Sequence, residues 1–209
     1  MNRGTRRAGG VAAAALMVLL LAACAGPATP LPRGEPWAAR QERLRSLTAW
    51  HLSGRIGLRT ELESWTLGLD WHQQGDRYRI RLSAPLGQGS AVLSGDGESV
   101  TLLSSRDPRP LHAGDAEALL RQALGWDLPV SGLRYWVLGL PAGTGEAVLE
   151  LDAAGRIRRL DEAGWAIDYR RYTRAGDLDL PAKLFLTRDG LEVRIVVQQW
   201  RIGGEAAGA

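Results

Sequence analysis

The sequence predicts a mainly β fold, a strongly curved antiparallel sheet or incompletely closed β-barrel with inserted helices plugging one end. Three observations predict it. Apolar and polar residues alternate with a period of two along most of the chain from Trp50 onward, as in strands that bury one face. Gly, Asp and Pro separate most of these runs. Two helical segments interrupt them midway. The number of runs indicates about ten or eleven strands. A plain β-sandwich is the alternative architecture.

The N-terminus has the three parts of an export signal. Arg3, Arg6 and Arg7 precede an unbroken apolar run, and small residues precede Cys24. The run is shorter than the ~20 residues that span a bilayer comfortably, so residues 1–23 are predicted to be a removed signal peptide. The whole chain has 26 Lys and Arg and 23 Asp and Glu. Removal of the signal peptide takes away three arginines and no acidic residue, so the mature chain has equal numbers of basic and acidic side chains. A neutral mature chain gives no electrostatic argument for binding nucleic acid.

The segment that ends in Cys24, Leu21-Ala22-Ala23-Cys24, resembles the lipobox of bacterial lipoproteins, whose cysteine is lipid-modified. Cys24 is the only cysteine, so a disulfide, a CxxC motif or a cysteine-based metal site would lack a second thiol. Lipidation of Cys24 is therefore predicted. The alternative is that Cys24 is simply one of the small residues near an ordinary signal-peptidase cleavage site. The resemblance implies three acyl chains and a stable anchor, because a single chain holds a protein only marginally. Ala25 is not the aspartate that tends to retain lipoproteins at the inner membrane, which favours the outer membrane.

The mature chain is predicted to consist of a tether, one domain and a tail. The tether is rich in Pro and small residues, and the remainder has the size of one domain, without internal repeats. The predicted bounds are 24–36 for the lipidated tether, 37–203 for the domain and 204–209 for a flexible tail.

The domain is predicted to begin with a helix at 37–47, followed by three strands within 50–59, 64–73 and 76–83. The segment QQGD joins the last two of these strands as a short hairpin connection. Further predicted strands are SAVLSG, SVTLLS, EAVLELD, RIRRLD, WAIDYRRY, AKLFLT and LEVRIVVQQW. Before EAVLELD, the segments GDAEALLRQALG and VSGLRYWVLGLP predict the two inserted helices.

Motifs of catalysis and metal binding are not found in the sequence. His51, His72 and His112 are far apart and lack ligand spacing; the first two fall on predicted outer faces and are expected to be solvated. GxSxG, SxxK and phosphate-loop motifs are missing, and Gly87-Gln88-Gly89 lacks the third glycine of a dinucleotide loop. The acidic pair Asp161-Glu162 has a turn-like context and is expected to be solvated. We therefore expect no catalytic residue, no metal ligand and no cofactor, and a protein that is not an enzyme, although a triad can assemble from distant residues.

Several segments, in the expected order over nearly all of the mature chain, resemble the family of the outer-membrane lipoprotein receptor LolB. They are GRIGL from Gly54, LDWHQQGDRYRIRLSAPLGQGS from Leu69, GWDLPVSGLRYWVLGLP from Gly125, AGWAIDYRRY from Ala163, LPAKLFL from Leu180, and Trp200.

The resemblance implies an open β-barrel with a hydrophobic cavity for acyl chains and no nucleotide. The implied function is to accept acylated lipoproteins from a LolA-like periplasmic carrier and to insert them into the outer membrane, on its periplasmic side. We expect a monomer that contacts its client lipoproteins and the lipid of the outer membrane. The alternatives are a structural or assembly partner in the outer membrane and, less favoured, an envelope hydrolase.

An acyl cavity must be lined by apolar side chains, because each buried CH₂ contributes about 0.8 kcal/mol. The chain has eight tryptophans and one phenylalanine, and such large side chains either line a cavity or fill a core. The candidates for the lining, each with ordinary core as the alternative, are Leu67, Leu69, Trp71, Ile80, Leu82, Leu133, Trp136 and Val137.

The segment APLGQGS places a large leucine, Leu86, between Pro85 and Gly87. Turns usually consist of small or polar residues, so this leucine needs an explanation. In the family that the chain resembles, a leucine on a protruding PLG turn is implicated in placing the lipoprotein into the membrane, and Leu86 matches it. We expect Pro85 and Gly87 to turn the chain so that Leu86 points outward. A loop folded back onto the core is the alternative.

Overall fold

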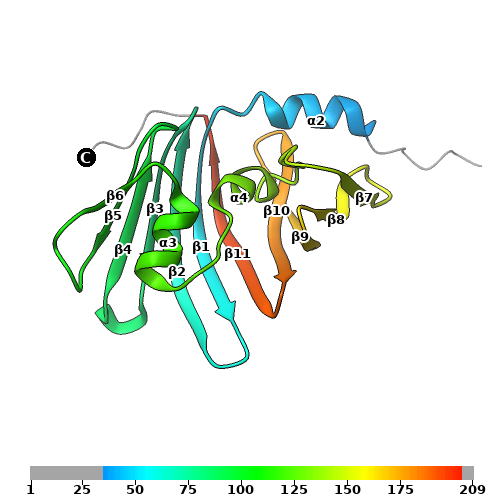
Figure 1. The fold of residues 1–209 in the computed structure, drawn as a ribbon. Helices are drawn as coiled ribbons and strands as arrows, with labels where there is room; N and C mark the ends of the chain where they lie inside the picture. The colour runs from blue at the N-terminus through cyan, green and yellow to red at the C-terminus, as the bar shows by residue number, and fades with distance from the viewer. Residues whose placement is uncertain (1–34, 204–209) are drawn as a thin grey trace, which may run out of the picture. The chain divides into compact units, whose positions relative to one another are not determined.

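In the computed structural model, which describes residues 35–203, the main element is one antiparallel sheet of eleven strands (Figure 1). Its strand order is β6-β5-β4-β3-β2-β1-β11-β10-β9-β8-β7, so β6 and β7 are its edges and the sheet is not closed. The predicted mainly β fold is therefore confirmed. The predicted signal peptide, Cys24, most of the tether and the tail lie outside the described residues.

The elements follow the predicted order. Ten of the eleven strands coincide with the alternating runs in the sequence, because one face of each is buried and the other is not. The elements are α2 (Trp37–Arg45), β1 (Ala49–Arg59), β2 (Ser64–Gln74), β3 (Arg77–Ser83), the 3₁₀ turn η2 (Pro85–Gly87), β4 (Ser90–Gly95), β5 (Val100–Ser104), β6 (Leu111–Ala113), α3 (Ala116–Leu124), α4 (Val130–Trp136), β7 (Ala147–Leu151), β8 (Ile157–Glu162), β9 (Trp165–Ala175), β10 (Leu178–Arg188) and β11 (Leu191–Ile202).

A bulge in the centre of the sheet curves it. β1 pairs with β11, and the register of this pair shifts between Ser53 and Gly54. A Cβ at position 54 would lie 2.1 Å from the carbonyl oxygen of Val196, so only glycine fits this close approach. Because a bulge bends its strand and increases the local twist, the two halves of the sheet turn toward the helices.

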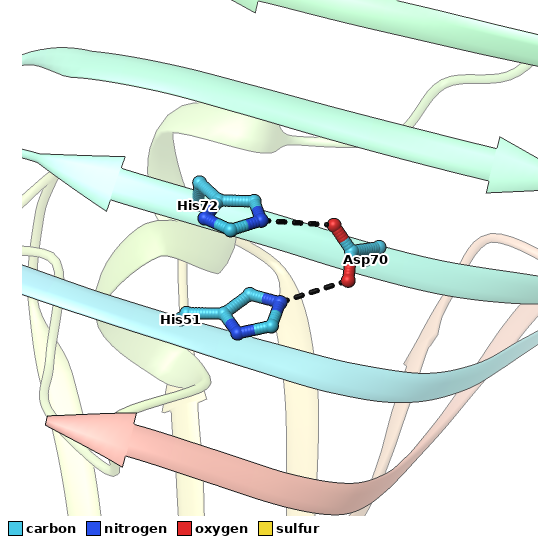
Figure 2. A group of neighbouring side chains, drawn as sticks. All are labelled: His51, Asp70 and His72. Carbon is cyan, nitrogen blue, oxygen red and sulfur yellow. Dashed lines mark hydrogen bonds and ion pairs between the residues drawn. The ribbon is translucent and has the colours of Figure 1, made fainter. Parts of the chain in front are cut away.

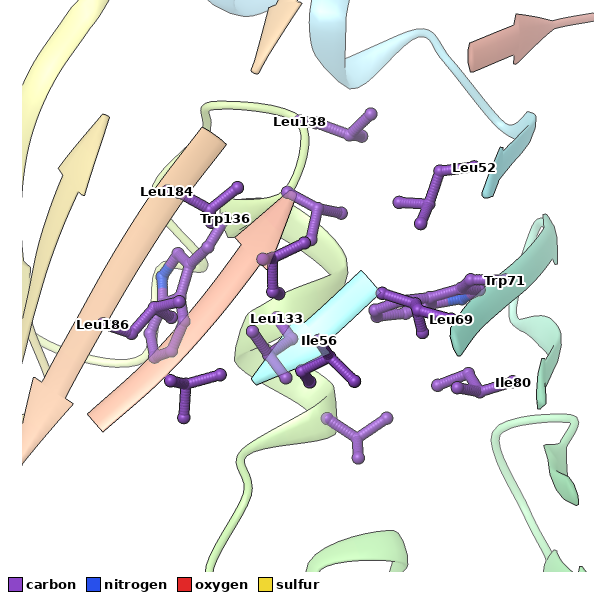
Figure 3. Packing of buried hydrophobic residues seen from close by; sticks show 14 of the residues in the cluster. Leu52, Ile56, Leu69, Trp71, Ile80, Leu133, Trp136, Leu138, Leu184 and Leu186 are labelled. Atoms are coloured by element: carbon purple, nitrogen blue, oxygen red, sulfur yellow. The ribbon is translucent and has the colours of Figure 1, made fainter. Parts of the chain in front are cut away.

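The inner face of the sheet and the two inserted helices enclose the hydrophobic core (Figure 3). Leu52, Ile56 and Leu58 of β1 are almost completely buried there. Helix α3 begins at Asp115, whose side chain accepts a hydrogen bond from the Glu117 amide, and ends at Gly125 in the left-handed conformation; these are ordinary start and stop signals. Helices α3 and α4 lie against the face of the sheet that carries the core (Figure 1).

Helix α2 is fastened to β10 by Arg40, a buried arginine whose Nη2 donates to the carbonyl of Asp179. Its guanidinium also lies 5.8 Å from the ring centroid of Tyr172, and desolvation by burial lowers the pKa of Arg40 from its ordinary value. None of the helices within residues 35–203 has both the length and the apolar character needed to cross a membrane.

Candidate functional site

An apolar pocket lies between the inner face of the sheet and the inserted helices. All of its lining side chains are apolar, and they come from β1 to β5, β11, α3, α4 and the segment between the helices. The free space within it is narrow, about 30 Å³. Its wall consists of Ile56, Leu69, Trp71, Ile80, Leu82, Ala91, Leu93, Leu102, Leu120, Leu128, Val130, Leu133 and Ile195.

The structure brings five of the eight candidate lining residues together on this wall, namely Leu69, Trp71, Ile80, Leu82 and Leu133. The other three lie elsewhere. Leu67 is half-buried and packs against the core, and Val137 is completely buried in the core.

Trp136, the third, points away from the pocket toward Leu184 and Leu186 (Figure 3), and its ring centroid lies 6.0 Å from that of Trp165. The assignment of these three residues to an acyl-binding surface therefore has no support from the pocket.

Sequence reasoning missed the part of the wall that β4 and β5 provide. Ala91, Leu93 and Leu102 line the pocket; alternation puts Ala91 and Leu93 on one face of β4, and Leu102 of β5 pairs with Leu93. Leu120 of α3 was on the apolar side of the predicted helix. The apolar positions were visible in the sequence, and knowledge of which strands are neighbours would have added these residues to the predicted lining.

A buried carboxylate fastens the C-terminal end of α4, and here the expectation of a solvated Asp161-Glu162 pair is wrong for Glu162. Glu162 is only 2% exposed, and its Oε2 accepts hydrogen bonds from Trp136 Nε1 at 2.8 Å and from the amide of Ala142 at 2.8 Å. Its Oε1 accepts from the amides of Gly143 and Thr144 at 2.7 and 3.3 Å. One side chain thus holds both α4 and the loop that follows it.

Tyr169 of β9 adds a second fastening at the same end of α4. Its hydroxyl donates to the carbonyl of Trp136 at 2.9 Å, and burial raises the pKa of Tyr169 well above its ordinary value. The N-terminal side of α4 is held differently. There Glu117 of α3 accepts from the amide and the hydroxyl of Ser131 at 2.9 and 2.7 Å, in an exposed position. These bonds join α3 to α4, and Asp127, just before α4, accepts a hydrogen bond from Arg188 of β10 at 2.8 Å in an exposed ion pair.

The loop between β3 and β4 presents Leu86 to solvent. Leu86 is 94% exposed and has left-handed backbone angles, φ 55° and ψ 24°. The base of the loop is closed by two hydrogen bonds, from the Ala84 amide to the Gly89 carbonyl at 2.8 Å and from the Gln88 amide to the Pro85 carbonyl at 3.2 Å. The leucine therefore projects from a defined turn and does not fold back onto the core.

On the outer face of the sheet, His51, Asp70 and His72 form a cluster (Figure 2). The expectation of solvated imidazoles holds for His72, whose side chain is 43% accessible, and is wrong for His51, at 15%. The two rings stack with centroids 4.0 Å apart, and both bond to Asp70. One nitrogen or carboxylate oxygen from each of the three residues lies within 4.8 Å of the others.

Comparison with known proteins identifies the family. The family model described as outer membrane lipoprotein LolB matches residues 48–200. The chain belongs to the LolB family. It is 43% identical over 187 residues to the outer-membrane lipoprotein LolB of Nitrosococcus oceani, covering 88% of this chain and 92% of the relative. It is 42% identical over 206 residues to that of Alkalilimnicola ehrlichii, covering 97% and 99% of the two chains. These relatives confirm the predicted location: the LolB-family chain is a lipid-anchored outer-membrane lipoprotein that faces the periplasm.

Solved structures share the fold of this LolB-family chain. A LolA-superfamily protein from Nitrosomonas europaea aligns with a TM-score of 0.51 at 8% identity, covering 83% of this chain and 96% of that chain. A putative outer membrane lipoprotein-sorting protein domain from Vibrio parahaemolyticus aligns with a TM-score of 0.52 at 12% identity, covering 79% and 90%. At these identities the likeness concerns the fold alone.

Proposed function

We propose that this LolB-family chain takes acylated lipoproteins from a LolA-like carrier, holds their acyl chains in its apolar pocket and inserts them into the outer membrane without nucleotide. The observation that carries the proposal is the pocket whose every lining side chain is apolar. The LolB relatives support a role in lipoprotein localisation, and they do not favour the alternative of a structural or assembly partner.

The chemistry of the wall fits a receptor that must also release its cargo. Acyl chains gain about 0.8 kcal/mol for each CH₂ removed from water, and that gain needs no specific polar contact. A wall without polar groups therefore holds any acyl chain and adds no directional bond that release would have to break. Passage from carrier to receptor to membrane is then an exchange between similar apolar environments, driven by differences in affinity.

Admission of an acyl chain requires the helices to move, because the free space in the pocket is narrow, about 30 Å³. Glu162 and Tyr169 hold the C-terminal end of α4 with buried hydrogen bonds. The start of α4 is tied to the sheet by the exposed ion pair of Asp127 with Arg188 of β10, for which water competes. We therefore propose that α3 and the start of α4 swing outward about the end held by Glu162.

Delivery is assigned to the turn that carries Leu86. Leu62, on the β1–β2 turn, is 93% exposed, and Leu86 is 94% exposed; strand pairing places the β1–β2 turn at the same end of the sheet as the β3–β4 turn that carries Leu86. Isolated exposed leucines are common, but two at one end form an apolar tip that can enter a bilayer. Burial of one leucine contributes about 1.5–3 kcal/mol, which suffices for transient contact and does not anchor the protein. Anchoring is assigned to acyl chains on Cys24, with residues 25–36 as the tether; the domain would act as a monomer.

Trp71 provides a direct test of the pocket. A fatty acid brominated near the middle of its chain, added to the mature protein, is expected to quench Trp71, because the indole lies on the pocket wall. The measurement is the quenched fraction of tryptophan fluorescence in the parent protein and in Trp71→Phe, which should lose most of the quenched signal.

The matched control is Trp37→Phe, since Trp37 lies on α2 and not on the pocket wall. This variant should keep the quenching. If Trp71→Phe is quenched as strongly as the parent protein, the acyl chain does not enter this pocket.

A further inference from the structure

A second group of side chains (Figure 2) lies on the opposite face of the sheet from the apolar pocket, since Asp70 and His72 alternate along β2 with the pocket residues Leu69 and Trp71. Asp70 and His72 are two residues apart on β2, so their side chains leave the same face of the strand. His51 on β1 pairs directly with His72, and directly opposed side chains on paired strands are close neighbours. The three side chains therefore converge because of strand register, on rigid elements in the middle of the sheet.

The ligating atoms already point toward one another. His51 Nε2 lies 2.8 Å from Asp70 Oδ2, and His72 Nε2 lies 3.1 Å from Asp70 Oδ1. The imidazole planes are nearly parallel, with an angle of 13° between them. One atom from each of the three residues falls within 4.8 Å of the others. Zinc bonds to imidazole nitrogen and carboxylate oxygen are about 2.0–2.2 Å long, so an ion between these atoms requires only rotation of the side chains.

We propose that His51, Asp70 and His72 form a binding site for a divalent transition-metal ion of the zinc class. Two imidazoles and one carboxylate suit Zn²⁺, Ni²⁺ or Cu²⁺, whereas Mg²⁺ and Ca²⁺ prefer a shell of oxygen ligands. The ion replaces the two hydrogen bonds between the rings and the carboxylate, which already hold the ligands close together. Three protein ligands leave one tetrahedral position to water.

Charged neighbours affect the affinity of this site for a metal ion. Arg201 on β11 pairs with His51, and Arg79 and Arg81 on β3 pair with His72 and Asp70. All three arginines are exposed, so solvent and salt screen their repulsion of a cation, although they lower its affinity. Within residues 35–203 the ion pairs of Asp70 are those with the two histidines, so its carboxylate is available to a metal ion.

Metal binding at this point joins β1 to β2 in the centre of the sheet. An ion that binds the folded domain and not the unfolded chain stabilises the fold by mass action. The proposal does not depend on the receptor function, since the site and the apolar pocket occupy opposite faces of the sheet. Failure of one would leave the other unaffected.

The test is isothermal titration of the mature protein, in detergent, with ZnCl₂ alone. One ion should bind for each chain and raise Tm. His51→Gln and His72→Gln should each weaken binding by more than about tenfold, since even the loss of an outer-shell partner costs that much. The matched control is His112→Gln: His112 bonds to Thr101 at 3.0 Å and lies outside the cluster, so this variant should bind Zn²⁺ as the parent protein does.

Co²⁺ absorption of the unmodified protein gives a second measurement that needs no variant. Visible absorption bands of Co²⁺ bound by few ligands are expected at neutral pH. The proposal is overturned if neither Zn²⁺ nor Co²⁺ binds, if binding survives both His51→Gln and His72→Gln, or if MgCl₂ binds as well as ZnCl₂.

Discussion

Replacement of Leu86 by glutamate is expected to leave acceptance of lipoproteins intact and to lower their delivery into liposomes by at least about tenfold. The side chain is 94% exposed, so the change removes little packing from the folded domain. It does remove the 1.5–3 kcal/mol or so that a leucine gains on entering an apolar phase, and it adds a charge that the bilayer core excludes. A loss of about 1.4 kcal/mol corresponds to a tenfold change. Delivery is measured as lipoprotein recovered with the liposomes after release from the receptor.

The backbone conformation of Leu86 allows a second test of this prediction with a different substitution. A left-handed conformation costs a residue with a Cβ about 1–2 kcal/mol, and asparagine tolerates it better than leucine. Leu86→Asn should therefore fold at least as stably as the parent protein and still lose delivery. Val148→Glu is the matched control, because Val148 is 59% exposed on the edge strand β7. Normal delivery by Leu86→Asn, or loss of acceptance by Leu86→Glu, would remove Leu86 from the membrane step.

Removal of the Glu162 carboxylate is expected to have the largest effect on stability. Glu162→Ala should lower the free energy of unfolding by about 3–5 kcal/mol, in the range for a buried charged partner whose contacts are left unpaired. The change leaves the indole of Trp136 and the amides of the loop after α4 without their acceptor. Urea unfolding followed by circular dichroism measures the difference.

The neighbouring residue provides the control for this prediction. Asp161 pairs with Arg159 in an exposed position, with side chains 43% and 39% accessible, and such surface pairs contribute about 0–1 kcal/mol. Asp161→Ala should therefore change the free energy of unfolding by less than about 1 kcal/mol. Equal effects of the two substitutions would show that Glu162 does not hold α4.

The sequence predicts the strands well, because alternation of apolar and polar residues follows directly from burial of one face. It did not reveal β6, Leu111–Ala113, because three residues are too few for a period of two to appear. The outward position of Leu86 did not follow from the local sequence, because the segment APLGQGS by itself favours a loop folded back onto the core; the resemblance to the LolB family favoured the exposed turn. Its role in membranes stays a prediction.

What sequence reasoning missed depends on contacts between distant segments. Glu162 looks like any acid near a turn, and its burial arises only because the loop around Ala142 wraps over it. His51 and His72 were correctly placed on outer faces. Their stacking follows from the hairpin register, in which Arg59 pairs with Ser64, and the alternation of either strand does not show that register.

Transfer from carrier to receptor tests the central claim most directly. A chain that lacks residues 1–24 is mixed with a complex of a LolA-like carrier and an acylated lipoprotein, and the lipoprotein bound to each partner is measured after separation. We expect the acylated lipoprotein to pass to this chain without nucleotide, and the same lipoprotein without its acyl chains not to bind. If the acylated lipoprotein stays with the carrier, or if the form without acyl chains binds equally well, the apolar pocket is not an acyl-chain receptor.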